Sequence, residues 1–181
     1  LAARNAALAY RHRYDEHAAA NHEALATLQQ ALRLPVLPRR IDCFDISTIQ
    51  GNETVASMVV CEDGRMRPGE YRRFRIQKKE ERRTNLAGTP RRSEGDVRFL
   101  DDFAAMEQVV RRRYARVLEA GGPFPDLVVV DGGKGQLNAA YQALETVGLS
   151  NLVTVALAKK EELVFTRDAV NPIALDRHGA A

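Results

Sequence analysis

Apolar residues recur at helical spacing near the start of the chain. The stripe consists of Ala24, Leu25, Leu28, Ala31 and Leu32. Spacings of three and four residues among good helix formers predict an amphipathic helix within residues 1–33. Prolines at positions 35 and 38 end it, because proline lacks a backbone donor and disfavours helical geometry in the residue before it. We therefore expect residues 1–38 to form a helical arm or linker, followed by a separate domain over 39–181.

A different pattern begins at residue 40. Short apolar or β-branched segments bounded by Gly, Pro and Asn predict strands, and two longer stretches with apolar residues on one side predict helices. In chain order these are strands at 40–49, 54–61 and 71–77, a helix at 101–118, a strand at 127–130, a helix at 135–147 and a strand at 152–157. Short links between the first three strands favour an antiparallel meander. The order β-β-β-α-β-α-β predicts an α/β domain with flanking helices around a five-stranded sheet.

Two further segments fall outside this order. Residues 78–98 are charged, poor in large apolar side chains and interrupted by Gly and Pro, so we expect a mobile loop or an insertion. Residues 163–166 and 172–175 are expected to form a small hairpin near the C-terminus.

The charge distribution suits a polyanionic partner. The net charge is +3 and the sequence pI is about 9.0, and the basic residues gather in clusters such as Arg72, Arg73 and Arg75. Clusters of this kind are typical of surfaces that bind nucleic acid, and a solvated surface explains any single one equally well.

The cysteines and the lack of long apolar runs indicate the compartment in which the protein is expected to work. Cys43 and Cys61 lack the CxxC spacing of zinc sites and do not suggest a disulfide framework, which fits a reducing cytoplasm. The chain contains no run of about 18 apolar residues that would span a membrane, and no signal peptide is expected. A start at Leu1 suggests a fragment of a longer protein.

Two aspartates stand where a carboxylate costs energy. Asp45 lies inside the first predicted strand, and Asp131 follows the apolar run 127–130 directly. A carboxylate in or beside a buried strand needs a cation or hydrogen-bond donors to offset its desolvation. If the two lie together, a divalent cation would keep both ionised, and hard oxygen ligands suit Mg²⁺ or Mn²⁺. The alternative is structural, with one aspartate capping a turn and the other accepting backbone hydrogen bonds.

The segment Gly132-Gly133-Lys134-Gly135-Gln136 resembles a turn that cradles a phosphate, with free amides at the start of a helix. It lacks the GxxxxGK[ST] spacing of a Walker A motif, which disfavours a nucleotide triphosphatase. We expect Lys134 to contact a DNA phosphate or to orient Asp131. Lys159 and Lys160 follow the last predicted strand and are further candidates for contacts with the DNA backbone.

Several strings of residues resemble one known family in the same order along the chain. They are Phe44-Asp45-Ile46-Ser47, Thr54-Val55-Ala56-Ser57, Tyr71-Arg72-Arg73-Phe74, Asp101-Asp102-Phe103-Ala104-Ala105-Met106, Val130-Asp131-Gly132-Gly133-Lys134-Gly135-Gln136-Leu137 and Leu157-Ala158-Lys159-Lys160-Glu161-Glu162. Together they resemble the C-terminal nuclease domain of UvrC, a component of the ABC excinuclease, over essentially all of residues 39–175.

The resemblance implies a ribonuclease H-like fold with a mixed sheet, in which the first and fourth strands lie side by side. It implies a metal-dependent endonuclease that cuts DNA 5′ to a lesion in nucleotide excision repair. Asp45, Asp131 and, by motif, Asp102 would be catalytic, with Mg²⁺ or Mn²⁺ on the first two, although a helix N-terminus would also favour an aspartate at 102 as a cap. The implied partners are double-stranded damaged DNA, bound in part through Arg72 and Arg73, and a UvrB-type damage-recognition helicase.

The chain departs from the family pattern near its end. The family's histidine belongs to a motif expected beyond residue 181, and His178 precedes that position, so we expect an incomplete and impaired centre here. By the same resemblance, we expect the family's N-terminal module for the 3′ incision and its helix-hairpin-helix pair to lie outside these residues. One alternative is a non-catalytic DNA-binding or assembly module of the same fold. Another is a ribonuclease H-like enzyme that acts on RNA hybrids or DNA junctions.

Overall fold

Strands from both halves of the chain join into one sheet. The computed structural model describes residues 2–49, 53–76, 94–159, 162–167, 169 and 171–174, and within the longer of these ranges it describes side chains for 17–47, 54–76 and 102–159. In chain order the elements are α1 (Ala2–Leu32), β1 (Arg40–Ile49), β2 (Glu53–Glu62), β3 (Arg65–Met66), the 3-10 turn η1 (Pro68–Glu70), β4 (Arg72–Arg75), α2 (Glu94–Ala120), β5 (Leu127–Asp131), α3 (Lys134–Thr146), β6 (Thr154–Ala158), β7 (Leu163–Phe165) and β8 (Ile173–Ala174).

The centre of the sheet is parallel and its flanks are antiparallel. In the described residues the strand order is β3-β2-β1-β5-β6-β7-β8, and β4, off this path, pairs with another part of β2. β1, β5 and β6 run parallel, whereas β2, β7 and β8 pair antiparallel with their neighbours. The first and fourth expected strands are therefore neighbours, and the sheet is mixed. Both features confirm the ribonuclease H-like arrangement.

The five expected strands are all present, and three short ones extend the sheet. β7 and β8 form the expected hairpin, while the two-residue β3 was not anticipated. The helix α2 begins at Glu94, seven residues before the expected start, so the last part of the segment 78–98 is helical rather than a loop. Residues 77–93 lie outside the described residues.

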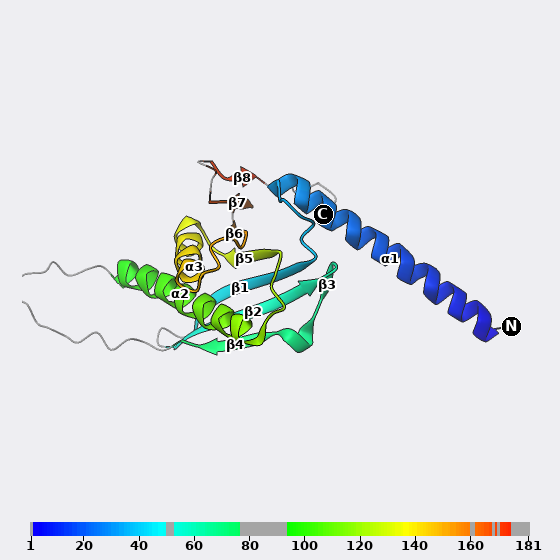
Figure 1. Ribbon diagram of the computed structural model, residues 1–181, viewed down its shortest axis with the longest axis horizontal. Coiled ribbons are helices and arrows are strands. Elements are labelled where there is room, and N and C mark those ends of the chain that lie inside the picture. The colour runs from blue at the N-terminus through cyan, green and yellow to red at the C-terminus, as the bar shows by residue number, and fades with distance from the viewer. Residues whose placement is uncertain are drawn as a thin grey trace, which may run out of the picture.

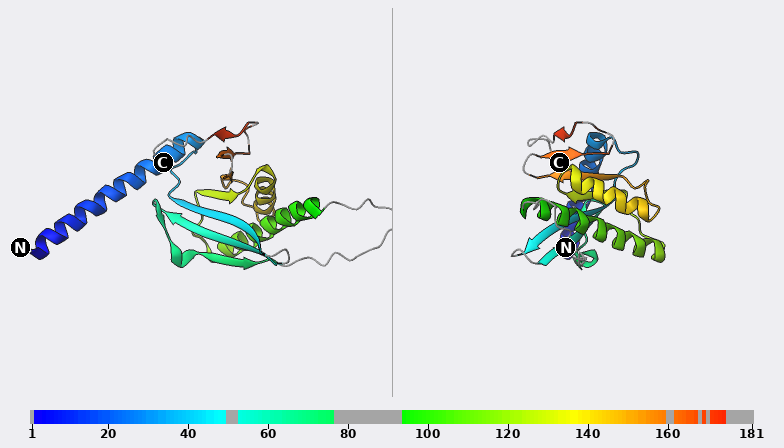
Figure 2. Two further views of the ribbon diagram at one scale, coloured as in Figure 1. Left: turned by 180° about the vertical axis from the view of Figure 1, so that it is seen from behind. Right: turned by 90° about the vertical axis from the view of Figure 1, so that its left-hand side faces the viewer.

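The two faces of the sheet are covered differently. Side chains that alternate along the strands, including Phe44, Met58 and Val130, pack against α2 and α3 in the larger core. The other face carries a smaller core, in which Leu32 and Leu34 at the end of α1 meet residues such as Leu127. Figures 1 and 2 show α2 and α3 side by side along the sheet, while α1 extends away from it as a rod. We call the side opposite α2 and α3 the open face.

No helix within the described ranges is both long and apolar enough to cross a membrane. The expected N-terminal helix is present, and its stripe supplies Leu25, Leu28 and Leu32 to the buried or partly buried surface.

Candidate active site

Asp45 and Asp131 lie side by side on the open face. β1 and β5 are parallel neighbours, with Phe44 opposite Val130, and the two aspartates are the next residues on their strands. Phe44 and Val130 point into the core under α2 and α3, so the residues that follow them point to the other side. The Asp45 carboxyl lies close enough to raise the pKa of the Asp131 carboxyl. The predicted juxtaposition of these aspartates is thus present.

Three groups surround the carboxylate pair. Lys159, directly after β6, places its Nζ 2.5 Å from Oδ2 of Asp131. Ser47 donates its hydroxyl to Oδ2 of Asp45 across 3.0 Å. Burial raises the pKa of the Asp131 carboxyl above its ordinary value, Lys159 lowers it, and the contact with Asp45 raises it. Both carboxylates therefore contact side chains of neighbouring residues.

Asp102 lies on α2 near the loop that follows Asp131. It stands in the third turn of a helix that begins at Glu94, so the interpretation of Asp102 as an N-terminal cap is wrong. The next residue, Phe103, lies over the start of α3, where a Cβ on Gly135 would come within 2.3 Å of the Phe103 ring. Only a glycine lets the ring sit this close to the α3 backbone. This contact ties the Asp102 turn to the loop after Asp131.

Two backbone amides of the glycine loop at 132–136 are bonded within the protein. Gly132 donates its amide to the Leu157 carbonyl at 3.0 Å, and Gly133 donates to Oε1 of Gln136 at 3.1 Å. The Gln136 side chain folds back over Gly132, where an added Cβ would meet it at 2.7 Å. These two amides are therefore not available to a phosphate, and a phosphate cradle at the first amides of α3 stays a prediction.

The two lysines near this loop have different surroundings. Lys134 is the first residue of α3 and is exposed. The ammonium that contacts Asp131 belongs to Lys159, so orienting Asp131 falls to Lys159 rather than to Lys134. Lys160 lies outside the described residues.

The arginines on β4 point to opposite faces. Arg73 pairs with Ser57 on β2, which pairs with Asp45 on β1. Arg73 therefore lies in the same row on the open face, two strands or about 10 Å from Asp45. Arg72 pairs with Met58 of the main core, and its guanidinium donates to the carbonyls of Gly69 and Tyr71. The predicted pair of DNA-binding arginines thus divides between the two faces.

Sequence reasoning missed the most deeply buried carboxylate. Asp42 on β1 is fully buried beneath α2, whereas Asp45, three residues later, is partly exposed. Arg113 of α2 lies 3.6 Å from Oδ2 of Asp42, Arg40 lies 3.8 Å from Oδ1, and the Tyr114 hydroxyl donates to Oδ2 at 3.4 Å. Burial raises the pKa of Asp42, and the two arginines lower it.

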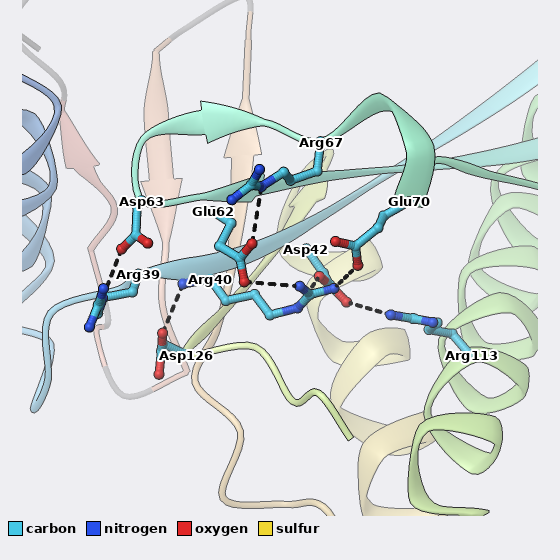
Figure 3. A network of polar contacts seen from close by, with 9 residues as sticks. All are labelled: Arg39, Arg40, Asp42, Glu62, Asp63, Arg67, Glu70, Arg113 and Asp126. Carbon is cyan, nitrogen blue, oxygen red and sulfur yellow. Dashed lines mark hydrogen bonds and ion pairs between the residues drawn. The ribbon is translucent and has the colours of Figure 1, made fainter. Parts of the chain in front are cut away.

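A network of ion pairs extends from Asp42 to the outer strands (Figure 3). Arg40, itself buried, also pairs with Glu70 and Glu62, and its backbone amide donates to Asp126 at 2.8 Å. The network joins β1, β2, η1 and α2 at the end of the sheet where β1 begins. Its signal in the sequence was a second aspartate inside a strand suited to burial. We regard Asp42 as structural, because its cationic partners are protein side chains.

The aspartate pair fits a hard divalent cation. Two adjacent carboxylates, one partly buried and both on an accessible face, are ligands that Mg²⁺ accepts together with water and substrate phosphates. Among the described residues, no group of three or more His, Cys, Asp and Glu side chains is arranged to hold a metal. In the part of the chain that the structure describes, Asp45 and Asp131 are therefore the candidates to hold such an ion. His178 lies outside the described residues.

Comparison with known proteins identifies the family. Residues 29–181 match the family described as the UvrC RNase H endonuclease domain. The chain belongs to this family. The resemblance inferred from the motifs is confirmed, and the chain aligns with curated relatives over most of its length.

Three relatives illustrate the similarity. UvrABC system protein C of Koribacter versatilis is 43% identical over 98% of this chain and 26% of the relative. The protein of that name from Acidobacterium capsulatum is 42% identical over 98% of this chain and 25% of its own. The one from Solibacter usitatus is 45% identical over 83% and 21%. The UvrC domain thus spans about a quarter of the length of these proteins.

Solved structures give a more distant match. Endonuclease V of Ciona intestinalis, in complex with a 24mer DNA containing an inosine followed by a ribo-adenosine, aligns with a TM-score of 0.41 and 20% identity. The alignment covers 67% of this chain and 46% of that one.

Proposed function

We propose that this domain hydrolyses a phosphodiester of damaged double-stranded DNA on the 5′ side of the lesion, with Mg²⁺ or Mn²⁺ on Asp45 and Asp131. The observation that carries the proposal is the carboxylate pair itself. Two aspartates on adjacent parallel strands share one accessible face, in a chain that belongs to an endonuclease family. Repulsion between them favours a divalent cation as their partner.

Each group on the open face has a chemical task in this proposal. A bound divalent ion would supply an activated water and would stabilise charge that develops on the phosphate. Asp45 and Asp131 would hold the ion, and the Ser47 hydroxyl fixes the orientation of the Asp45 carboxylate. Asp102, which Phe103 and Gly135 hold near the loop after Asp131, would orient water or phosphate from the side of α2.

DNA would lie across the open face. Arg73 stands in the same row as Asp45, and Lys159 contacts Asp131 from the end of β6, so phosphates on both sides of the cut would meet cations. The exposed Lys134 at the start of α3 would add a further contact. Such contacts fix the position of the backbone and read no sequence. We infer that the lesion is selected by a UvrB-type partner in the bacterial cytoplasm, through the longer protein that carries this domain.

The test uses a full-length UvrABC system protein C that carries this domain, reconstituted with its partner proteins on DNA with a single lesion. Asp45→Asn and Asp131→Asn should each lower the rate of 5′ incision at least about 100-fold, because each removes a charged ligand. Both should leave the 3′ incision intact. Asp63→Asn is the matched control, since Asp63 pairs with Arg39 at an exposed turn of β2 and β3, and it should cut normally.

The result also separates the two other functional classes. Normal 5′ incision by either site variant would refute a catalytic role for the pair. Loss of loading onto DNA together with loss of both incisions would instead favour a binding or assembly module. Replacing the lesion-containing duplex by an RNA hybrid or a branched DNA tests the remaining alternative, and faster cleavage of either would contradict the proposal.

A further inference from the structure

Lys159 reaches back onto the carboxylate pair from the end of β6. Leu157 is the partner of Asp131 in the register between β6 and β5, and Lys159 is two residues further along. Because side chains two residues apart point to the same face, Lys159 emerges on the open face. Its ammonium lies 2.5 Å from Oδ2 of Asp131, although the lysine side chain is 66% exposed and that of Asp131 only 21%.

The Lys159 ammonium reduces the electrostatic repulsion between the Asp45 and Asp131 carboxylates. Asp45 and Asp131 follow the paired residues Phe44 and Val130 on adjacent strands, and two neighbouring carboxylates repel each other when both are ionised. The guanidinium of Arg73 lies two strands away. Lys159 is the cation that touches the pair among the ion pairs of the described residues. An ordinary exposed ion pair contributes little, but here one partner is mostly covered, so the interaction is less screened.

We propose that Lys159 is a built-in counter-ion of the metal-free site, which a divalent cation displaces from Asp131 and which then turns to a phosphate of the bound DNA. The proposal rests on the proposed function for the ligands of the cation. It adds that the lysine and the cation compete for the same carboxylate oxygen. Lysine suits this exchange because its flexible stem carries a compact charge and forms no fixed bidentate contact.

Competition has a direction that can be measured without DNA and without catalysis. Whatever disfavours the lysine contact must favour the cation by the same factor, since coupling free energies are reciprocal. If the lysine has no energetic link to the metal site, its removal should leave the metal affinity unchanged. A lysine that helps to hold the metal-bound geometry predicts weaker binding. Competition between the ammonium and the cation for the carboxylate pair predicts tighter binding.

The experiment titrates the 181-residue chain with Mn²⁺, followed by calorimetry and by the loss of free Mn²⁺ signal in electron paramagnetic resonance. Lys159→Gln should bind Mn²⁺ about fivefold more tightly than the native chain, or more, the range of ordinary couplings between sites. Lys159→Arg keeps the charge and should remain near the native affinity. Arg39→Gln removes an exposed cation that pairs with Asp63 before β1 and should change the affinity by less than about twofold, because charges away from the site are screened.

Thermal unfolding gives a second readout. Without metal, Lys159→Gln should melt at a lower temperature than the native chain, since its carboxylate pair has lost its counter-ion. Added Mn²⁺ should raise its melting temperature by more than it raises that of the native chain.

The outcomes distinguish the two proposals. Unchanged or weaker Mn²⁺ binding by Lys159→Gln, with binding still abolished by Asp131→Asn, would overturn the counter-ion proposal and leave the proposed function standing. Equal affinities for the Gln and Arg variants would do the same. Failure of both the native chain and Lys159→Gln to bind Mn²⁺ would overturn both proposals.

Discussion

The close contact between Phe103 and Gly135 predicts that even Gly135→Ala, which adds a single methyl group, destabilises the domain. A Cβ at position 135 would lie 2.3 Å and 2.5 Å from two atoms of the Phe103 ring, roughly 1 Å closer than ordinary contact. Alanine also improves helix propensity by up to about 1 kcal/mol, while overpacking of this kind costs about 1–3 kcal/mol. We expect Gly135→Ala to lower the free energy of unfolding by about 1–2 kcal/mol, with the clash outweighing the propensity.

A double-mutant cycle isolates the clash. In a Phe103→Ala background the ring is gone, so Gly135→Ala should become neutral or stabilising, and the sign of its effect should reverse. Urea unfolding followed by circular dichroism measures all four variants. A Gly135→Ala variant as stable as the native chain, or the same loss in both backgrounds, would refute the close approach of the ring to α3. In the full-length protein, Gly135→Ala should also slow the 5′ incision, because small displacements of catalytic groups are costly.

Three further results are expected from the buried network and from β4. Asp42→Ala should lower the free energy of unfolding by about 3 kcal/mol in urea titrations, because it leaves buried arginine charge without its partner; a loss as small as that of an exposed substitution would contradict the network. The pKa of Asp42 is raised above its ordinary value of 3.8, so its contribution to stability is present at low pH and declines as the pH rises through the folded pKa. The stability of the native chain relative to Asp42→Asn should therefore fall as the pH rises above the ordinary Asp pKa of 3.8, and an increase in relative stability over that range would contradict the raised pKa. Arg73→Gln should reduce the salt dependence of DNA binding by roughly one phosphate contact in fluorescence anisotropy, and Arg72→Gln by clearly less; equal effects would show that both arginines meet DNA.

Local patterns predicted the elements of this fold well, because most of the signal is local. The alternation along β1 and the apolar run of β5 placed both strands, and the stripe before residue 33 placed α1. The start of α2 was missed because glycine and dense charge within residues 94–100 argue against a helix locally. A helix once formed extends cooperatively from its packed turns, and that packing is not visible in the sequence.

The candidate site was predictable only in part. The pairing of β1 with β5 joins residues far apart in the sequence, such as Phe44 and Val130, and it came from the family resemblance rather than from any pattern. Sequence alone could not rank Asp42 against Asp45, since both lie in one strand and the covered face is decided by Arg113, far along the chain. The contact of Lys159 with Asp131 and the folding back of the Gln136 side chain depend on side-chain conformations. Neither contact could be predicted from the residue types in the loop.

Asp42 has a consequence for how β1 finds its place in the sheet. A buried ion pair adds little net stability compared with apolar residues, but a misplaced one is expensive. A slip of β1 by one residue would turn Phe44 to the open face and carry Asp45 beneath α2, while Asp42 would leave Arg113. Asp42 and Asp45 are an odd number of residues apart, so their side chains point to opposite faces of the sheet. Together they therefore disfavour a one-residue slip of β1. In the observed register alone, Asp42 meets Arg40 and Arg113 beneath α2 while Asp45 lies on the open face.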